Sequence, residues 1–113
     1  TSWKNSRKEN QFIMNENYVV TVDLELKNKD DFQKAYNTLM KNALSSLKKE
    51  EGCLRFDVIK IDESNDFMLY EIYKNRQSFL DHLNTNHYLE FKNLSTSIFD
   101  KIEIRFGTLK VTE

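Results

Sequence analysis

Four segments of the chain alternate between apolar and polar residues, which is the pattern of strands that bury one face. The alternation is clearest in the first segment, where Val20, Val22 and Leu24 take every second position. We expect the even-numbered residues of all four strands to form one apolar face against the core. The predicted strands are Tyr18–Lys27, Cys53–Asp62, Phe67–Lys74 and Lys101–Val111.

Two further segments have the apolar spacing of amphipathic helices. The first runs from Phe32 to about Lys49, and Gly52 follows it as a stop signal. The second runs from Asn75, which can cap a helix, to about Phe99. We expect the sequence Asn-Thr-Asn at residues 84–86 to interrupt this second helix.

The order of the predicted elements is βαββαβ. Connections of this kind fold into a four-stranded antiparallel sheet with both helices on one face, so we expect a ferredoxin-like α+β domain. This domain takes up residues 18–113. Residues 1–17 show no sustained periodicity, and we expect them to form a flexible tail.

The odd-numbered face of the sheet is expected to hold Arg55, Asp57, Glu71 and Tyr73 together, among apolar residues. Composition leaves two interpretations open. Either the face is exposed to solvent and carries ion pairs from Arg55 to Asp57 or Glu71, or the same face of a second copy covers it. A half-buried carboxylate beside an arginine can also act as a proton acceptor with an altered pKa.

The composition narrows the choice of partners. The net charge is −1, from 17 basic and 18 acidic residues, so nothing indicates binding to nucleic acid or to an anionic membrane surface. No apolar run reaches about 18 residues, which argues against a membrane span. The chain has one cysteine, Cys53, and therefore no internal disulfide. We expect a cytoplasmic protein.

His82 and His87 are the strongest candidates for acid–base chemistry, because only imidazole titrates near neutral pH without help from its surroundings. Each can equally be a residue that packs at a helix end. Together with Asp81 they match no standard metal-ligand spacing, so we expect no metal. Cys53 has no base beside it in the sequence and is not expected to be a nucleophile. No glycine-rich phosphate loop indicates a nucleotide or flavin.

Three short motifs carry a family resemblance. They are EEGCLRFDV at Glu50–Val58, MLYEIY at Met68–Tyr73 and HLNTNHY at His82–Tyr88. In this order they resemble the antibiotic biosynthesis monooxygenase (ABM) domain family, over roughly Tyr18 to Val111. Two positions depart from the common pattern, because Glu51 and Asn86 stand where many relatives have proline. The relatives that process phosphorylated autoinducer-2 also carry Glu-Glu-Gly at the first of these positions.

The resemblance implies a dimeric α+β barrel, in which two ferredoxin-like subunits pack sheet to sheet, with a pocket between sheet and helices. It therefore favours the homodimer over the solvated face. Relatives include cofactor-free monooxygenases of quinols or polyketides and an autoinducer-2-processing enzyme. Haem-degrading relatives share the fold but need an asparagine on the first strand and a tryptophan on the third. Val22 and Tyr73 stand at those places, so we do not expect haem degradation.

We therefore expect a cofactor-independent monooxygenase that acts on a quinol-like or phenolic small molecule. The alternatives are an isomerase or degrading enzyme for an autoinducer-2-like phosphorylated carbonyl compound, and a non-catalytic dimeric binding module. Aromatic pocket walls favour the first, converging Lys or Arg groups the second, and a filled pocket the third. The expected catalytic residues are His82, His87 and Tyr73. The expected substrate-binding residues are Arg55, Glu71, Tyr70, Tyr88 and Phe91.

Overall fold

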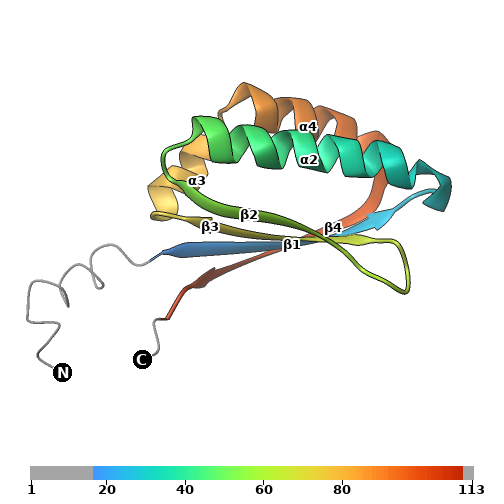
Figure 1. Ribbon diagram of the computed structural model, residues 1–113, viewed down its shortest axis with the longest axis horizontal. Coiled ribbons are helices and arrows are strands. Elements are labelled where there is room, and N and C mark those ends of the chain that lie inside the picture. The colour runs from blue at the N-terminus through green and yellow to red at the C-terminus, as the bar shows by residue number, and fades with distance from the viewer. Residues whose placement is uncertain (1–16, 111–113) are drawn as a thin grey trace, which may run out of the picture.

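A computed structural model of the chain describes residues 17–110 (Figure 1). These residues form a βαββαβ unit in which the second helix is divided into two pieces. The tail predicted for residues 1–17 lies outside the described residues except for Asn17. The elements are β1 (Tyr18–Leu26), η2 (Lys29–Asp31), α2 (Phe32–Lys49), β2 (Cys53–Lys60), β3 (Phe67–Tyr73), α3 (Arg76–His82), α4 (Asn86–Ile98) and β4 (Phe99–Thr108).

The four strands form one antiparallel sheet in the order β2-β3-β1-β4. The helices α2, α3 and α4 all lie on the same face of this sheet, and no element among the described residues covers the other face (Figure 1). The predicted ferredoxin-like α+β fold is therefore confirmed. None of the helices within residues 17–110 has the length and apolar character that crossing a membrane requires.

Helix α2 buries one stripe of its surface against the sheet. Asn28 caps the short η2 helix that leads into α2, since its side chain accepts a hydrogen bond from Asp30 N at 2.9 Å. Ala35, Leu39 and Ala43 are fully buried on the inner stripe. The helix ends at Lys49, as the sequence predicts, and the residue that follows, Glu50, enters the candidate site.

The predicted break in the second helix is confirmed. Asn75 caps α3 by accepting a hydrogen bond from Ser78 N at 2.9 Å, and α3 ends at His82. Thr85 then caps α4 by accepting from Tyr88 N at 3.2 Å. The Thr85 hydroxyl also donates a 2.7 Å hydrogen bond to the carbonyl of His82. The break thus holds the backbones at the end of α3 and the start of α4 in a fixed relation.

The predicted inner face of β3 is wrong. Lys60 pairs with Phe67 across the β2–β3 hairpin, so even-numbered residues of β2 lie opposite odd-numbered residues of β3. Directly opposite residues in an antiparallel pair point to the same face. Phe67, Leu69, Glu71 and Tyr73 therefore face the helices, as β1 also requires by pairing Val20 with Glu71. Met68, Tyr70 and Ile72 were predicted for the core face but lie on the opposite face of the sheet. We call this face, which no helix among the described residues covers, the open face.

Strand β2 has its predicted inner face only from Phe56 onward. The pairing shifts between Cys53 and Arg55, and this irregularity leaves Leu54 51% exposed. Phe56 and Val58 do face the helices. Arg55 forms the predicted bridge to Asp57, with Nε 2.7 Å from Oδ2, on the open face. The alternative bridge to Glu71 is excluded, because that carboxylate lies on the opposite face.

Strand β4 presents its apolar side to the helix face but extends past the helices. Ile102, Ile104 and Phe106 pair with Leu24, Val22 and Val20 and so point the same way as those core residues. They nevertheless remain 42%, 48% and 55% exposed. The edge of the sheet is therefore apolar and only partly covered, and this edge forms one side of the candidate site.

Candidate functional site

A cavity of about 200 Å³ lies between the inner face of the sheet and helices α3 and α4. We call it the central cavity. Its walls are mostly apolar, since aliphatic residues of β1, β3 and β4 form the floor and aromatic residues of the helices form the roof. Few polar groups reach it. The aromatic wall consists of Phe79, Tyr88 and Phe91.

Glu71 is the acidic group of the central cavity, on the floor contributed by β3. Its carboxylate is buried, and this burial raises the pKa of Glu71 to about 7, although a hydrogen bond from Tyr73 acts in the opposite direction. The Tyr73 hydroxyl donates this bond at 2.6 Å. Burial, followed by the charge of Glu71, raises the pKa of Tyr73 and leaves its hydroxyl a donor. Glu71 can therefore exchange a proton near neutral pH.

His82 lies at the other side of the central cavity, as the last residue of α3. Its Nδ1 is 2.8 Å from Glu50 Oε2 and 3.4 Å from Ser46 Oγ. An ionised carboxylate only accepts hydrogen bonds, so the imidazole proton is on Nδ1 when the ring is neutral. Within residues 17–110, Nε2 makes no hydrogen bond. The neutral ring thus has its free lone pair on the edge turned away from Glu50.

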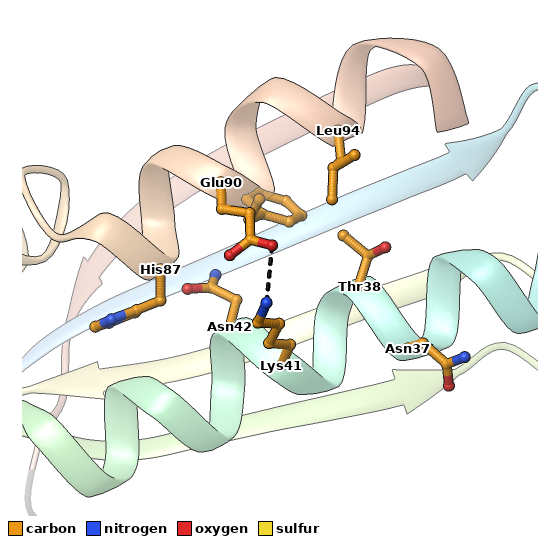
Figure 2. Close-up of a pocket in the computed structure, with 8 residues that line it drawn as sticks. Asn37, Thr38, Lys41, Asn42, His87, Glu90 and Leu94 are labelled. Atoms are coloured by element: carbon orange, nitrogen blue, oxygen red, sulfur yellow. Dashed lines mark hydrogen bonds and ion pairs between the residues drawn. The ribbon is translucent and has the colours of Figure 1, made fainter.

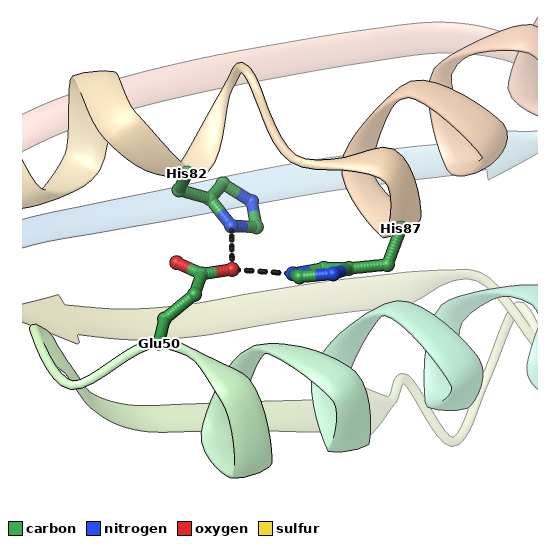
Figure 3. Close-up of side chains that lie close together, drawn as sticks. All are labelled: Glu50, His82 and His87. Carbon is green, nitrogen blue, oxygen red and sulfur yellow. Dashed lines mark hydrogen bonds and ion pairs between the residues drawn. The ribbon is translucent and has the colours of Figure 1, made fainter.

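Glu50 connects both histidines. One oxygen, Oε2, accepts hydrogen bonds from His82 Nδ1 and from His87 Nε2 (Figure 3). Burial raises the pKa of Glu50, but the bonds from His82 and His87 outweigh it, and the pKa lies below its usual value. Glu50 is therefore ionised at neutral pH. We call these three side chains the Glu50–His82–His87 cluster; each comes from the end of a different helix, α2, α3 or α4.

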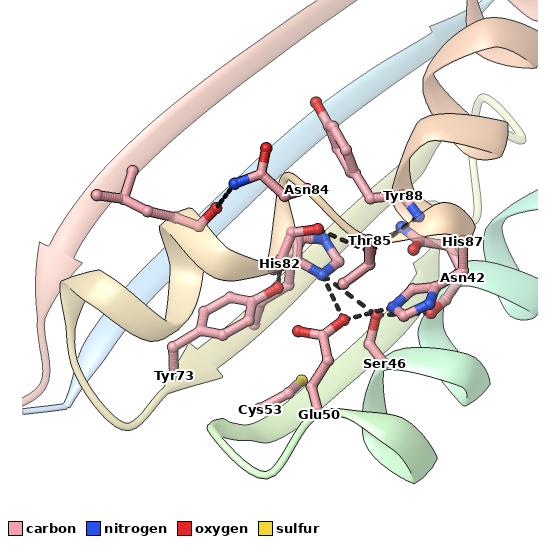
Figure 4. Close-up of polar contacts among 12 residues, drawn as sticks. Asn42, Ser46, Glu50, Cys53, Tyr73, His82, Asn84, Thr85, His87 and Tyr88 are labelled. Atoms are coloured by element: carbon pink, nitrogen blue, oxygen red, sulfur yellow. Dashed lines mark hydrogen bonds and ion pairs between the residues drawn. The ribbon is translucent and has the colours of Figure 1, made fainter.

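Asn42 is a buried amide with an unpaired oxygen. It is 3% exposed and lies on the inner stripe of α2, and its Oδ1 lacks a hydrogen-bond partner among the described residues. An unpaired buried acceptor costs about 1–3 kcal/mol, which a ligand that donates a hydrogen bond can recover. Asn42 lines the central cavity and stands close to Ser46 and His87 (Figure 4).

A second cavity of about 170 Å³ adjoins the first, between α2 and α4 (Figure 2). Asn42 and Phe91 line both cavities, and His87 lines only this second one. Lys41 and Glu90 form a 2.8 Å ion pair across its outer side. The second cavity therefore gives His87 an opening of its own, separate from that of His82.

The structure brings together some of the site residues that the sequence predicts and separates others. His82, Glu71, Tyr88 and Phe91 line the central cavity. Tyr73 lies directly behind Glu71, fully buried, and contacts the rings of Phe79 and His82. His87 belongs to the Glu50–His82–His87 cluster and the second cavity.

Arg55 and Tyr70 are not part of this site. They lie on the open face of the sheet, where the Arg55 guanidinium sits 5.7 Å from the centre of the Tyr70 ring. Their side chains are separated from the central cavity by the sheet itself. The expectation that Arg55 shares a face with Glu71 is wrong, because Arg55 pairs with Ile72 and the neighbouring Phe56 pairs with Glu71.

Sequence reasoning missed Glu50 and Asn42 as site residues. Glu50 opens the EEGC motif and follows a helix directly, so its position at a helix end was visible, but its partners lie 32 and 37 residues further on. Asn42 follows Leu39 by three residues and precedes Ser46 by four, inside an apolar stripe. A lone amide in such a stripe was the available signal.

The sequence profile of the ABM family, antibiotic biosynthesis monooxygenase, matches residues 19–94. Among curated proteins, human N-terminal EF-hand calcium-binding protein 1 is 25% identical over 100 residues, which are 88% of this chain and 26% of that protein. The same values hold for its counterpart from Pongo abelii. The chain thus spans about a quarter of the length of these relatives.

Solved structures of similar fold agree with the profile. A candidate antibiotic biosynthesis monooxygenase from Bacteroides thetaiotaomicron superposes with a TM-score of 0.78 at 18% identity, over 85% of this chain and 91% of that one. Another from Nitrosomonas europaea gives 0.77 at 26% identity, over 83% and 90%. The profile match covers more than half of the chain and includes the segments that hold Glu50, Glu71, His82 and His87. The chain therefore belongs to the antibiotic biosynthesis monooxygenase family.

Proposed function

We propose that this protein is a cofactor-independent monooxygenase that oxidises a quinol-like or phenolic small molecule in the central cavity. The observation that carries the proposal is the position of His82. The Glu50 carboxylate holds the proton of the neutral ring on Nδ1, which leaves Nε2 as a proton acceptor. His82 lines the central cavity and Glu50 does not, so the free edge of the ring is the one available to a substrate.

The chemistry needs a substrate that supplies its own electrons. Removal of a phenolic proton by His82 gives an electron-rich anion, which can react with molecular oxygen without a metal or flavin. For a hydroquinone with a free ring position, one oxygen atom enters the ring and the other leaves as water, so that a quinol and O₂ give a hydroxyquinone and H₂O. The quinol supplies all four electrons and the balance is complete.

The walls of the cavity support an aromatic substrate. Phe79, Tyr88 and Phe91 line the cavity and offer aromatic rings to a substrate. Burial, together with the charge of Glu71, raises the pKa of Tyr88 and keeps its hydroxyl a donor for a developing oxyanion. A cavity of about 150 Å³ is known to hold benzene. The central cavity of about 200 Å³ therefore suits one substituted ring.

The cavity gives less support to the alternatives. Lys92 is the only cation among the described residues that line it, whereas a phosphorylated carbonyl compound needs several converging cations. A non-catalytic binding module is expected to have a filled or purely complementary pocket. Here the carboxylate residue Glu71, whose pKa burial raises to about 7, and the imidazole residue His82 both line unfilled space. These groups favour catalysis over storage.

We propose further that two copies pack through the open face of the sheet. Among the described residues, this face carries Met68 and Tyr70 uncovered by any helix, beside the Arg55–Asp57 and Arg105–Asp23 ion pairs. Sedimentation equilibrium at micromolar concentration should give the mass of two chains. A charge placed on this face by Tyr70→Asp should shift the mass toward one chain, and a wild-type monomer would exclude the proposal.

The function is tested by oxygen uptake with reduced benzoquinols and naphthoquinols, against an enzyme-free autoxidation control. We expect uptake above background and a product that carries one oxygen atom more and two hydrogen atoms fewer than the quinol. His82→Gln should lower the rate by about 100-fold or more, the range of a lost general base. Tyr70→Phe, on the open face, should leave the rate per folded protein unchanged. No uptake with any quinol would contradict the proposal.

A further inference from the structure

The Glu50–His82–His87 cluster has the composition of a metal site as well as that of a hydrogen-bond network. One ligand atom from each side chain lies within 4.8 Å of the other two. All three side chains are nearly buried, with exposures of 11%, 3% and 8% for Glu50, His82 and His87. Figure 3 shows the two imidazole edges turned toward the same carboxylate oxygen.

Two imidazoles and one carboxylate match the chemistry of a three-ligand zinc site, which leaves a fourth position for water. In such a tetrahedral site neighbouring ligand atoms lie about 3.3 Å apart, from metal–ligand distances of about 2.0–2.2 Å. The atoms of the cluster need small side-chain rotations to reach this spacing. Both nitrogens already face Oε2 of Glu50, so an ion between them needs the Glu50 carboxylate to withdraw from the two rings.

The backbone around the cluster is fixed, which favours metal binding over a mobile hydrogen-bond network. His82 ends α3 and His87 lies in the first turn of α4, and Thr85 joins the two by bonds to His82 O and Tyr88 N. Glu50 is fixed at the end of α2 by its backbone bond to Ser46 O at 3.0 Å. The ligands are therefore held before the ion arrives, and little ordering entropy opposes binding.

An ion also has a polar route to the cluster. Glu50 lines a depression of about 250 Å³ at the surface, together with Glu51 and Asp81 and with one lysine, Lys74. This depression is distinct from the central cavity, which Glu50 does not line. A cation can thus reach Glu50 without passing through the apolar cavity.

We propose that Glu50, His82 and His87 form a binding site for one divalent transition-metal ion of the zinc class, coordinated by Glu50 Oε2, His82 Nδ1 and His87 Nε2. The metal takes the place of the two imidazole protons that Glu50 accepts in the metal-free form. The proton of neutral His82 then moves to Nε2, and the ring becomes a donor toward the central cavity. Metal-loaded protein and protein with a basic His82 are therefore alternative states of one molecule.

The test uses metal alone and needs no substrate. Chelator-treated protein without an affinity tag is titrated with Zn²⁺ by isothermal calorimetry, with Co²⁺ as a spectroscopic substitute. We expect saturation at one ion per chain. His87→Gln and Glu50→Gln should each weaken the apparent affinity at least about tenfold, because the loss of an outer-shell partner alone already costs about 10–100-fold. Glu51→Gln, which removes a neighbouring carboxylate outside the cluster, should bind like the wild type.

Nitrogen-15 NMR gives a second readout that does not depend on variants folding. The sequence has two histidines, so two imidazole patterns are expected. Zn²⁺ should shift Nδ1 of one ring and Nε2 of the other. Unchanged imidazole spectra, or equal Zn²⁺ affinity in His87→Gln and the wild type, would overturn the proposal. Neither result bears on oxygen uptake by metal-free protein, so this site and the proposed function fail independently.

Discussion

The hydroxyl of Tyr73 donates a 2.6 Å hydrogen bond to the buried carboxylate of Glu71, on the floor of the central cavity. This pair couples the pH of the solution to the stability of the fold. Burial raises the pKa of Glu71 from 4.5 to about 7 in the folded chain. Below the lower value both folded and unfolded chains bind the proton, and above the higher value neither does.

The free energy of unfolding is therefore expected to fall as pH rises from about 4.5 to about 7, because the unfolded chain releases the Glu71 proton first. The loss amounts to about 3 kcal/mol, at about 1.4 kcal/mol for each pKa unit. Glu71→Gln removes it, so this variant should gain stability relative to the wild type over the same pH range. Urea unfolding of both proteins at several pH values measures the difference. A difference independent of pH would contradict the assigned pKa.

Tyr73→Phe should lower stability by about 1.5–3 kcal/mol above neutral pH, the range for a hydrogen bond to a charged group. The loss should be smaller at acidic pH, where Glu71 is protonated. Tyr70→Phe is the matched control, since Tyr70 lies three residues earlier on the same strand but faces the open side of the sheet. Thermal or urea unfolding at two pH values checks this. Equal losses of stability in both variants would mean that the hydrogen bond from Tyr73 to Glu71 does not contribute to the stability of the fold.

Gly52→Ala should destabilise the fold by about 1–3 kcal/mol, because the added Cβ has no room. It would lie 2.2 Å from Ser78 Oγ and 2.5 Å from Ser78 Cβ. Gly107→Ala is the control, since its Cβ would meet no atom within 4 Å. The double variant Gly52→Ala, Ser78→Gly should recover part of the loss. The midpoints of urea unfolding measure these effects. Equal shifts for Gly52→Ala and Gly107→Ala would contradict the close packing of Gly52 against Ser78.

The thiol of Cys53 should be unreactive in the folded protein. Burial, with the charges of Glu50 and Glu71, raises its pKa to about 12, so almost no thiolate exists at neutral pH. A thiol-specific disulfide reagent should react slowly with native protein and rapidly in urea. Fast labelling of native protein would show that Cys53 is accessible and ionised, and would reopen its role as a nucleophile.

The sequence by itself determined the element order, the helix break and the fold. Local patterns carry this information, because the alternation in Tyr18–Leu26 and the apolar stripe of α2 depend on neighbours a few residues away. The break at residues 84–86 was equally local. His82 could be named as a site residue from the chemistry of its imidazole, and Tyr88 and Phe91 as cavity walls because local patterns place their helix over the sheet.

Only the tertiary structure decided which face of β3 is buried. The sequence FMLYEIY is apolar or amphipathic at nearly every position, so alternation cannot give its phase. Phase is set by the pairing of Lys60 with Phe67, a property of the hairpin register. Because of this register, Glu71 and Tyr73 lie beneath the helices, whereas Arg55 and Tyr70 lie on the open face.

The tertiary structure also brought Glu50 to His82 and His87. Glu50 is separated from them by two strands and a helix, and no local pattern connects positions so far apart. Their contact follows from the docking of the ends of α2, α3 and α4 on one sheet. Sequence periodicity predicts which face of a helix or strand a residue occupies. It does not predict which residue of another element lies opposite, so contacts made by docking cannot be predicted from it.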